Sequence, residues 1–349
     1  MQADQKNVQN RDRRIFAIGD VHGCARELEA LLMKLNIQKE DLVVFLGDYV
    51  DRGPDSRQVV ETVIRLKERC EVVALKGNHE AMFLDFLEHP ESPGAGLFVL
   101  NGGTSTLANY AGPEGSIEMP QSHVDFFRGL KLSYETEKYF FVHAGVPNQP
   151  LSTLDEKQHE LHMLWSRYPF LNSHYPWEKV VVHGHTPVRE VDVQPNRINL
   201  DTGCVYDGKL TAMEFPGRIV HQVEKLSRRE TALYPKDPNE PARISMRFSG
   251  KLPVSAGRKG ERPSDYETLN YNQFGLLMRD VNPSLENDLK IGDRIQGVIG
   301  SDPASLVYFD GEVVRTDSKG SLVVYGVRID ELKSGDAAGS MSGPNRTAK

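Results

Sequence analysis

Three short apolar runs near the start of the chain are each followed, within two residues, by a glycine and then an acid or an amide. The runs are residues 15–18, 42–46 and 72–75, and they lead into Gly-Asp-Val-His-Gly, Gly-Asp-Tyr-Val-Asp-Arg-Gly and Gly-Asn-His-Glu. Continuous apolar runs of this length are typical of strands that are buried on both faces. Because open α/β sheets bind ligands at the carboxyl ends of their strands, we expect the three phrases to meet at one edge of a sheet.

The segments around these runs alternate between helical and strand-like patterns. Apolar residues recur at helical spacing over residues 26–35, 58–69 and 81–87. A stretch rich in glycine and proline, residues 90–103, indicates a loop near the site. Parallel strands with helices between them, followed by further strands, predict an α/β sandwich with outer helices. The later strands are expected at residues 138–142, 179–182, 198–200 and 210–215.

The composition indicates a globular protein of two domains. The chain has 349 residues and a formal net charge of -7, which disfavours binding to nucleic acid polymers. No apolar run is long enough to span a membrane, and the polar start of the sequence does not resemble a signal peptide. The three cysteines, Cys24, Cys70 and Cys204, are far apart, as in reduced cytosolic proteins. We therefore expect a cytoplasmic protein.

Six side chains supply the oxygen and nitrogen donors that divalent metals prefer. Aspartate, histidine and asparagine suit manganese, iron, zinc or magnesium. The two carboxylate oxygens of Asp48 can bridge two ions, and two adjacent ions can hold a phosphoryl group from both sides. Between His183 and His185 we favour His185, which follows Gly184, as a ligand. The expected ligands are Asp20, His22, Asp48, Asn78, His143 and His185.

Two arginines and an acid pair complete the expected site. Arg52 and Arg167 remain charged at any relevant pH, and a guanidinium fork matches two phosphate oxygens. His79 is the expected general acid for the leaving oxygen, with Asp51 as its orienting partner. A carboxylate raises the basicity of an imidazole and fixes its tautomer. Together these residue types favour hydrolysis of a phosphate ester.

Eight phrases in the first domain match one family of enzymes. They are GDVHG at 19–23, GDYVDRG at 47–53, GNHE at 77–80, NGG at 101–103, VHAG at 142–145, WSR at 165–167, HGHTP at 183–187 and LDTG at 200–203. With them, residues 14–215 resemble the phosphoprotein-phosphatase branch of the calcineurin-like metallophosphoesterases, especially the bacterial and phage-type serine/threonine phosphatases. The resemblance implies an αββα sandwich and two divalent metal ions, manganese first or an iron–zinc pair, with attack by a metal-bridging hydroxide. It implies the same metal ligands, phosphate-binding arginines and acid pair.

This resemblance favours phosphoserine or phosphothreonine in a protein as the substrate. A related class hydrolyses symmetrical bis(5'-nucleosyl) tetraphosphates. That class usually carries aspartate at the position of Glu80, and its second phrase is less like Tyr-Val-Asp-Arg-Gly. Both differences favour a phosphoprotein, and the dinucleoside tetraphosphate stays the alternative substrate.

The sequence changes character after the first domain, which we place at residues 14–226. Residues 227–242 hold three prolines among charges and indicate a semi-rigid linker. Residues 243–332 predict a small all-β barrel, because short strand patterns alternate with turn residues. Residues 333–349 are rich in glycine, serine and alanine and predict a disordered tail. The barrel strands are expected at residues 244–248, 275–278, 294–298, 306–309, 313–315 and 322–329.

Two patterns in the barrel region resemble the signatures of PilZ domains. Arg243 and Arg247 lie four residues apart, and Asn270, Asn272 and Gly275 form the second pattern, with Asn272 in place of the usual serine. The resemblance implies that these five residues bind cyclic di-GMP and that the dinucleotide regulates the phosphatase. The alternatives are a barrel that does not bind the dinucleotide, and a cyclic di-GMP receptor whose phosphatase domain is vestigial. The intact donor set of the first domain argues against the receptor.

Overall fold

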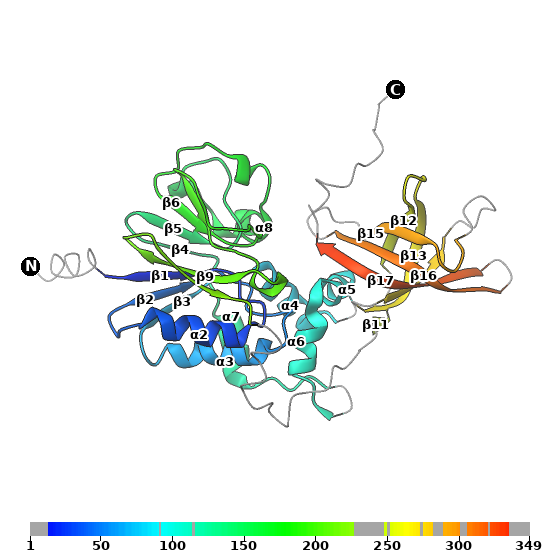
Figure 1. The fold of residues 1–349 in the computed structure, drawn as a ribbon, viewed down its shortest axis with the longest axis horizontal. Helices are drawn as coiled ribbons and strands as arrows, with labels where there is room; N and C mark the ends of the chain where they lie inside the picture. Colours follow the sequence, from blue (N-terminus) through cyan, green and yellow to red (C-terminus); the bar gives the residue numbers. More distant parts are fainter. Residues whose placement is uncertain are drawn as a thin grey trace, which may run out of the picture. The chain divides into compact units, whose positions relative to one another are not determined.

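The computed structural model describes residues 13–90, 92–113, 116–226, 248–249, 252–272, 275–281, 289–300, 306–319 and 322–334 (Figure 1). The chain divides into two compact units, residues 1–81 with 105–242, and residues 82–104 with 243–349. This division differs from the predicted domains at residues 82–104, which the prediction places in the first domain. The linker expected at 227–242 lies outside the described residues, so its boundaries stay predictions.

The first unit contains a five-stranded sheet that begins with the first apolar run. Its order is β10-β9-β1-β2-β3, and β1, β2 and β3 are parallel. Two antiparallel strands, β9 and β10, extend the sheet beyond β1. The three apolar runs therefore lie side by side, as predicted. The strands are β1 (Ile15–Ile18), β2 (Leu42–Phe45), β3 (Glu71–Ala74), β9 (Lys209–Phe215) and β10 (Ile219–Glu224).

A second five-stranded sheet in the same unit is built from the later strands. Its order is β4-β5-β6-β8-β7, in which β5, β6 and β8 are parallel. The edge strands β4 and β7 pair antiparallel with their neighbours. The strands are β4 (Ser133–Glu135), β5 (Tyr139–Val142), β6 (Val180–His183), β7 (Asp192–Val193) and β8 (Arg197–Asn199).

The two sheets share one apolar core, which is the physical basis of the sandwich. Val44, Phe141 and Val182 are fully buried in it, and the ring centroids of Tyr139 and Phe215 lie 4.3 Å apart across it. Helices α2 (Ala25–Leu35) and α3 (Ser56–Leu66) lie along the first sheet (Figure 1). Burial of continuous apolar strands between two sheets supplies the main stabilisation of such a layered fold. The predicted α/β sandwich is confirmed.

Residues 90–103, predicted as a loop, contain two helical segments instead. They are α5 (Pro93–Phe98) and the π-helical turn η1 (Val99–Gly103). The Ser92 hydroxyl accepts a hydrogen bond of 3.1 Å from the Ala95 N–H, which caps the start of α5. Proline suits the first turn of a helix, because its missing N–H would have had no partner there. The loop prediction is therefore wrong, since proline begins the helix.

The remaining helical segments connect the strands of the first unit. The helices expected at residues 26–35, 58–69 and 81–87 correspond to α2, α3 and α4. Within the described residues, no helix has both the length and the apolar character needed to cross a membrane. The segments not yet named are α4 (Asn78–Glu88), α6 (Thr104–Asn109), α7 (Gln121–Arg128), η3 (Leu151–Thr153), α8 (Glu156–Trp165), η4 (Phe170–Asn172) and η5 (Cys204–Tyr206).

The C-terminal region forms a closed antiparallel barrel. Six strands pair in the order β12-β15-β16-β17-β14-β13, and β13 pairs back onto β12 to close the ring. The interior is apolar and includes Val254, Ile295, Phe309 and Tyr325. The predicted small β-barrel is confirmed, although two of its strands, β12 and β13, were not expected. The strands are β11 (Phe248–Ser249), β12 (Pro253–Arg258), β13 (Ser264–Asn272), β14 (Gly275–Asp280), β15 (Arg294–Ile299), β16 (Val307–Lys319) and β17 (Leu322–Ser334).

Candidate metal centre

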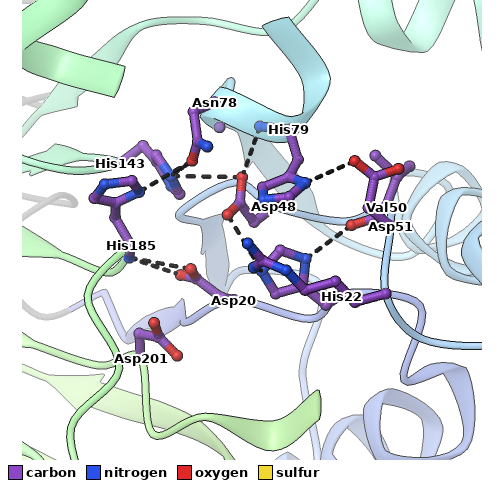
Figure 2. A network of polar contacts seen from close by, with 12 residues as sticks. Asp20, His22, Asp48, Val50, Asp51, Asn78, His79, His143, His185 and Asp201 are labelled. Carbon is purple, nitrogen blue, oxygen red and sulfur yellow. Dashed lines mark hydrogen bonds and ion pairs between the residues drawn. The ribbon is translucent and has the colours of Figure 1, made fainter. Parts of the chain in front are cut away.

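Loops at the carboxyl ends of five parallel strands bring the predicted metal ligands together (Figure 2). All six side chains are buried, with exposed fractions of at most 6%. They come from both sheets, so the site lies where the two halves of the sandwich meet. Asp20 and His22 follow β1, Asp48 follows β2, Asn78 follows β3, His143 follows β5 and His185 follows β6.

Two clusters of donor atoms share one carboxylate. His22, Asp48 and His79 form the first cluster, and Asp48, His143 and His185 form the second. Within each cluster one ligand atom per residue lies within 4.8 Å of the others. A carboxylate that belongs to both clusters can bridge a pair of ions, as two-metal sites require. The clusters therefore fit a binuclear site.

The two clusters place His79 and Asp20 in other roles than the sequence prediction gave them. His79, predicted as a general acid, belongs to the first cluster, whereas Asp20, predicted as a ligand, belongs to neither. The Asp20 carboxylate accepts a hydrogen bond of 3.0 Å from the backbone N–H of His185. The roles of both residues stay predictions, and the metal content of variants can separate them.

Several hydrogen-bond acceptors of the site lie close to one another, and this shows whether the site suits cations. His143 donates from Nδ1 to the Leu46 carbonyl at 2.9 Å, so its Nε2 lone pair faces inward. That Nε2 lies 2.9 Å from Oδ1 of Asn78 and 3.5 Å from Oδ1 of Asp48. His22 also binds a backbone carbonyl through Nδ1 and holds Nε2 3.3 Å from Oδ2 of Asp48, but there the Arg52 guanidinium already donates to Nε2. Acceptors this close repel one another unless a cation lies between them, so the donor set fits divalent metal ions.

Burial sets the protonation of these donors. It lowers the pKa values of His79, His143 and His185 from the ordinary histidine value, so His143 and His185 are neutral and keep a lone pair for a metal ion. Burial, reinforced by the nearby Asp201 carboxylate, raises the pKa of Asp20. Neutral imidazoles beside crowded carboxylates form a site that a cation stabilises.

Both predicted phosphate-binding arginines border the clusters. Arg52 donates from Nη1 to Nε2 of His22 at 2.7 Å, and Arg167 donates from Nε to Nε2 of His185 at 3.2 Å. The Tyr206 ring lies against Arg52, with 5.5 Å between the guanidinium carbon and the ring centroid. Tyr206 is 57% exposed, so an aromatic surface open to solvent stands beside one of the arginines. The sequence did not point to this tyrosine.

The predicted acid pair is held in place by hydroxyl groups. Oδ2 of Asp51 and Nδ1 of His79 share a hydrogen bond of 2.6 Å, and both residues are buried. The Thr106 hydroxyl donates to the other Asp51 oxygen at 2.6 Å, while the Asp51 N–H donates to the Ser56 hydroxyl at 3.1 Å. Thr106 is thus a positioning residue, and nothing in the sequence signals it because it lies far along the chain.

Glu80 supports the loop that carries Asp48. Its carboxylate accepts hydrogen bonds from the backbone N–H groups of Asp48, Tyr49 and Gly77 at 2.8 to 2.9 Å. The loop approaches so closely that a Cβ atom on Gly77 would collide with the Asp48 carboxylate. Glu80 is fully buried and turned toward the backbone, so its identity does not distinguish one substrate from another by direct contact. This observation removes one reason for favouring a phosphoprotein.

Five site residues other than glycine adopt the left-handed backbone conformation. Their φ angles lie between 45° and 70°. This conformation is uncommon for residues with a side chain, and it concentrates at functional sites because the surrounding structure must enforce it. The strain aims the side chains inward from tight turns. The residues are His22, Asp48, Asp51, Arg52 and His185.

Asp201 and His183 both lie near the site, but their side chains make different contacts. Asp201, part of the Leu-Asp-Thr-Gly phrase, is buried close enough to Asp20 to raise its pKa, and it accepts a hydrogen bond of 3.0 Å from the Gly203 N–H. His183 instead packs edge-on against the Phe170 ring, 5.0 Å away, on the second sheet. Asp201 therefore lies beside the site, whereas His183 packs against an aromatic ring, and the choice of His185 as the metal ligand stays a prediction.

The predicted cyclic di-GMP residues are only partly described. Arg243 and Arg247 lie outside the described residues. Asn270 and Asn272 lie in β13 and Gly275 begins β14, where Asn272 pairs with Gly275 across the hairpin. A PilZ-like site therefore stays a prediction.

The fold and the paired donor clusters together define a metal-dependent phosphoesterase, and the sequence comparison names the family. A family model described as calcineurin-like phosphoesterase matches residues 13–215. The chain therefore belongs to the calcineurin-like phosphoesterase family. The match covers the domain that carries every residue of the candidate metal centre.

The curated relatives that this chain resembles differ in the substrates that their names give. An asymmetrical bis(5'-nucleosyl)-tetraphosphatase PrpE from Oceanobacillus iheyensis is 30% identical over 58% of this chain and 89% of its own length. Serine/threonine-protein phosphatase 1 from Salmonella typhimurium is 31% identical over 57% of this chain and 90% of its own length. A serine/threonine phosphatase structure from Saccharomyces cerevisiae is 16% identical, covers 64% of this chain and 83% of that one, and gives a TM-score of 0.47.

Proposed function

We propose that the first domain hydrolyses phosphoserine and phosphothreonine in proteins with the help of two divalent metal ions. The observation that carries the chemistry is the pair of donor clusters that share Asp48, with Arg52 and Arg167 at their border. A phosphate ester needs charge neutralisation and an activated water, and this arrangement suits both needs. The similarity to the Salmonella serine/threonine-protein phosphatase supports a protein substrate.

The metal ions would be held by residues from both sheets. Asp20, His22 and Asp48 would hold one ion, and Asp48, Asn78, His143 and His185 the other. Manganese is the first expectation, with iron or zinc as alternatives, because the set mixes imidazole with oxygen ligands. When bound, the ions would neutralise the phosphate and lower the pKa of water so that hydroxide is available near neutral pH.

The arginines and the acid pair would act on the substrate itself. Arg52 and Arg167 would hold the phosphate oxygens through charge-assisted hydrogen bonds. Burial raises the pKa of Asp51 and lowers that of His79, so the pair holds its shared proton without a net positive charge. With that proton toward Nδ1, the Nε2–H of His79 can protonate the leaving oxygen.

A substrate panel on the purified protein tests this proposal. We expect a phosphoserine peptide to be hydrolysed in the presence of manganese, with the activity lost in chelator and restored by the metal. The kcat/KM for the peptide should exceed that for a dinucleoside tetraphosphate. A chelator-resistant activity would contradict the metal-dependent site, and preference for the nucleotide would contradict the protein substrate alone.

A dinucleoside tetraphosphate is the second candidate, and Tyr206 is the observation that favours it. An exposed aromatic ring beside Arg52 offers a surface on which a base can stack. The similarity to the tetraphosphatase from Oceanobacillus iheyensis supports the same substrate class. The products distinguish two modes: symmetrical cleavage of diadenosine tetraphosphate gives two ADP, and asymmetrical cleavage gives ATP and AMP. Tyr206→Ala should raise KM for the nucleotide more than for a phosphopeptide.

The barrel is proposed to regulate the phosphatase by binding cyclic di-GMP. The support is the sequence pattern of Arg243, Arg247, Asn270, Asn272 and Gly275, on a region that folds as a closed barrel. Calorimetry should detect binding that is lost in the Arg243→Ala/Arg247→Ala variant, together with a changed rate on a phosphopeptide. If high micromolar dinucleotide gives no heat with the folded protein, the barrel has another role.

A further inference from the structure

We propose that Lys225 and Cys24 are positioning residues for one of the two metal ions. That ion, called the first ion below, is the one that Asp20, His22 and Asp48 would hold, so the inference rests on the proposed two-metal function. Lys225 directly follows β10, and Cys24 directly precedes α2, two residues after His22. All of these residues belong to the first unit.

The turn that carries His22 has a backbone conformation that contacts with other segments must enforce. The φ angle of His22 is 45°, in the left-handed region that residues with a side chain seldom adopt, and that of Gly23 is 63°. A Cβ atom on Gly23 would lie 2.9 Å from the backbone of Gly53, so the turn is also closely packed. A strained turn keeps its shape only where its surroundings determine it. The contacts that support this turn therefore affect the direction of the His22 imidazole.

A chain of two hydrogen bonds runs from Lys225 to the backbone of this turn. Nζ of Lys225 donates to Sγ of Cys24 at 3.1 Å, and the Cys24 thiol donates to the His22 carbonyl oxygen at 3.6 Å. Cys24 is only 1% exposed, so water does not replace either bond at the sulfur. Contacts behind a metal ligand orient it, and their loss typically costs about tenfold or more in metal affinity. Removing the thiol or the ammonium should therefore weaken the first ion.

A buried carboxylate holds Lys225 in place for this contact. Oε1 of Glu27 lies 3.0 Å from Nζ of Lys225 and accepts a hydrogen bond of 3.2 Å from the backbone N–H of Leu226. The Glu27 side chain is 5% exposed, and a carboxylate so deeply buried needs such partners. The backbone N–H of Lys225 also donates to the Gly208 carbonyl at 3.0 Å, just after the turn that carries Tyr206. Lys225 is thus fixed by its side chain and by its backbone.

A matched pair of cysteine variants tests the role of the thiol in the full-length protein. Cys24→Ala breaks the chain but leaves the ion pair of Glu27 with Lys225 intact. Cys70→Ala is the control, because it removes another buried thiol, which donates to the Leu66 carbonyl of α3 at 3.8 Å. Titration with manganese, followed by the electron paramagnetic resonance of the free ion, should show one ion bound about tenfold more weakly in Cys24→Ala. The other ion, and both ions in Cys70→Ala, should bind as in the wild type.

Lysine variants separate positioning of the metal ligand from stabilisation of the fold. Lys225→Met leaves the Glu27 carboxylate buried without its cation, so both the manganese affinity and the midpoint of urea unfolding should fall. In the double variant Glu27→Gln/Lys225→Met the charge is gone and the midpoint should recover. The affinity should stay low there, because no ammonium donates to Cys24. Lys34→Met is the control, since Lys34 also joins α2 to β10, through the Gln222 carbonyl at 3.0 Å.

Hydrogen exchange of residues 19–24 in chelator-treated protein gives a readout that does not depend on the ions. Exchange there should be faster in Cys24→Ala than in Cys70→Ala, because the turn has lost one restraint. The proposal is overturned if Cys24→Ala matches the control in manganese affinity and in exchange, or if the double variant recovers affinity together with stability. A wild type that binds no manganese would contradict the proposed function, and the exchange rates would then decide whether the thiol supports the turn.

Discussion

The two domains place their charged side chains in opposite environments. In the first domain Asp48, Asp51 and Glu80 are at most 2% exposed, and backbone N–H groups or buried partners surround them. In the barrel, charged pairs such as Arg328 with Glu312 line the outside of neighbouring strands, with side chains 55% and 30% exposed. Buried charges are costly and persist where chemistry needs them, whereas exposed pairs contribute little to stability. The same residue types therefore indicate function in one domain and solubility in the other.

The largest effect is expected from Asp48→Asn, which tests the role of a buried charge in the first domain. We expect activity to fall to background at saturating manganese, because the shared carboxylate would lose the charge that holds both ions. Asparagine tolerates the left-handed conformation of this position, with φ of 53°, so the fold should persist. Metal analysis and circular dichroism would accompany the rate measurement. Retention of most of the wild-type rate would remove Asp48 from the bridging role.

His79→Asn comes next and separates the two roles open to this residue. A general acid is typically worth about 10²-fold or more, so turnover on a phosphopeptide should fall by that amount. The loss should shrink on p-nitrophenyl phosphate, whose leaving group needs little protonation. Metal content should stay at the wild-type level. Loss of one ion per chain would instead make His79 a ligand, as its place in the first donor cluster allows.

Glu80→Gln tests whether a buried carboxylate that is turned toward the backbone stabilises the site. The amide has one acceptor oxygen, and its NH₂ group would face backbone N–H donors, so we expect a loss of about 3 kcal/mol in unfolding free energy. Glu88→Gln, at an exposed position near the end of α4, is the matched control and should change little. Urea denaturation of both variants gives the comparison. Equal stabilities would mean that the loop does not depend on the carboxylate.

The sequence predicted most of the first domain because local patterns determine its elements. The strand at residues 15–18 was predicted with the bounds of β1, and α2 begins one residue before its predicted start. The phrases after the strands located the donor set, since the chain must turn at the strand end. Thr106 could not be predicted, because its contact with Asp51 spans 55 residues and depends on the whole fold.

The barrel was harder to predict because its strands are defined by long-range pairing. β13 has the polar sequence Ser-Asp-Tyr-Glu-Thr-Leu-Asn-Tyr-Asn, which lacks a continuous apolar signal, and β12 pairs with it across a turn. Two predicted strands, 306–309 and 313–315, belong to the single strand β16, whose register shifts between Asp310 and Gly311. β17 also continues to Ser334, two residues into the predicted tail. Sequence patterns therefore predict a barrel here, but they do not predict the register of its strands.

The smallest expected effect comes from a charged pair of the barrel. Arg258 donates from Nε and Nη2 to Oδ2 of Asp293 at 2.9 and 2.6 Å, with side chains 29% and 22% exposed. These hydrogen bonds lower the pKa of Asp293. A lowered carboxyl pKa contributes stability above the unfolded value of about 3.9, and the contribution disappears as pH falls through the folded pKa.

Arg258→Ala should therefore destabilise the barrel at neutral pH by at most about 1 kcal/mol, and by less near pH 3. Hydrogen exchange of β12 and β15 in the full-length protein measures the change, since these strands carry the two residues or flank them. Asp293→Asn is the reciprocal variant and should show the same loss at neutral pH. An effect as large as that of Glu80→Gln would show that this pair is coupled to the barrel core. The exposed fraction of a charged side chain would then no longer predict how much it contributes to the stability of its domain.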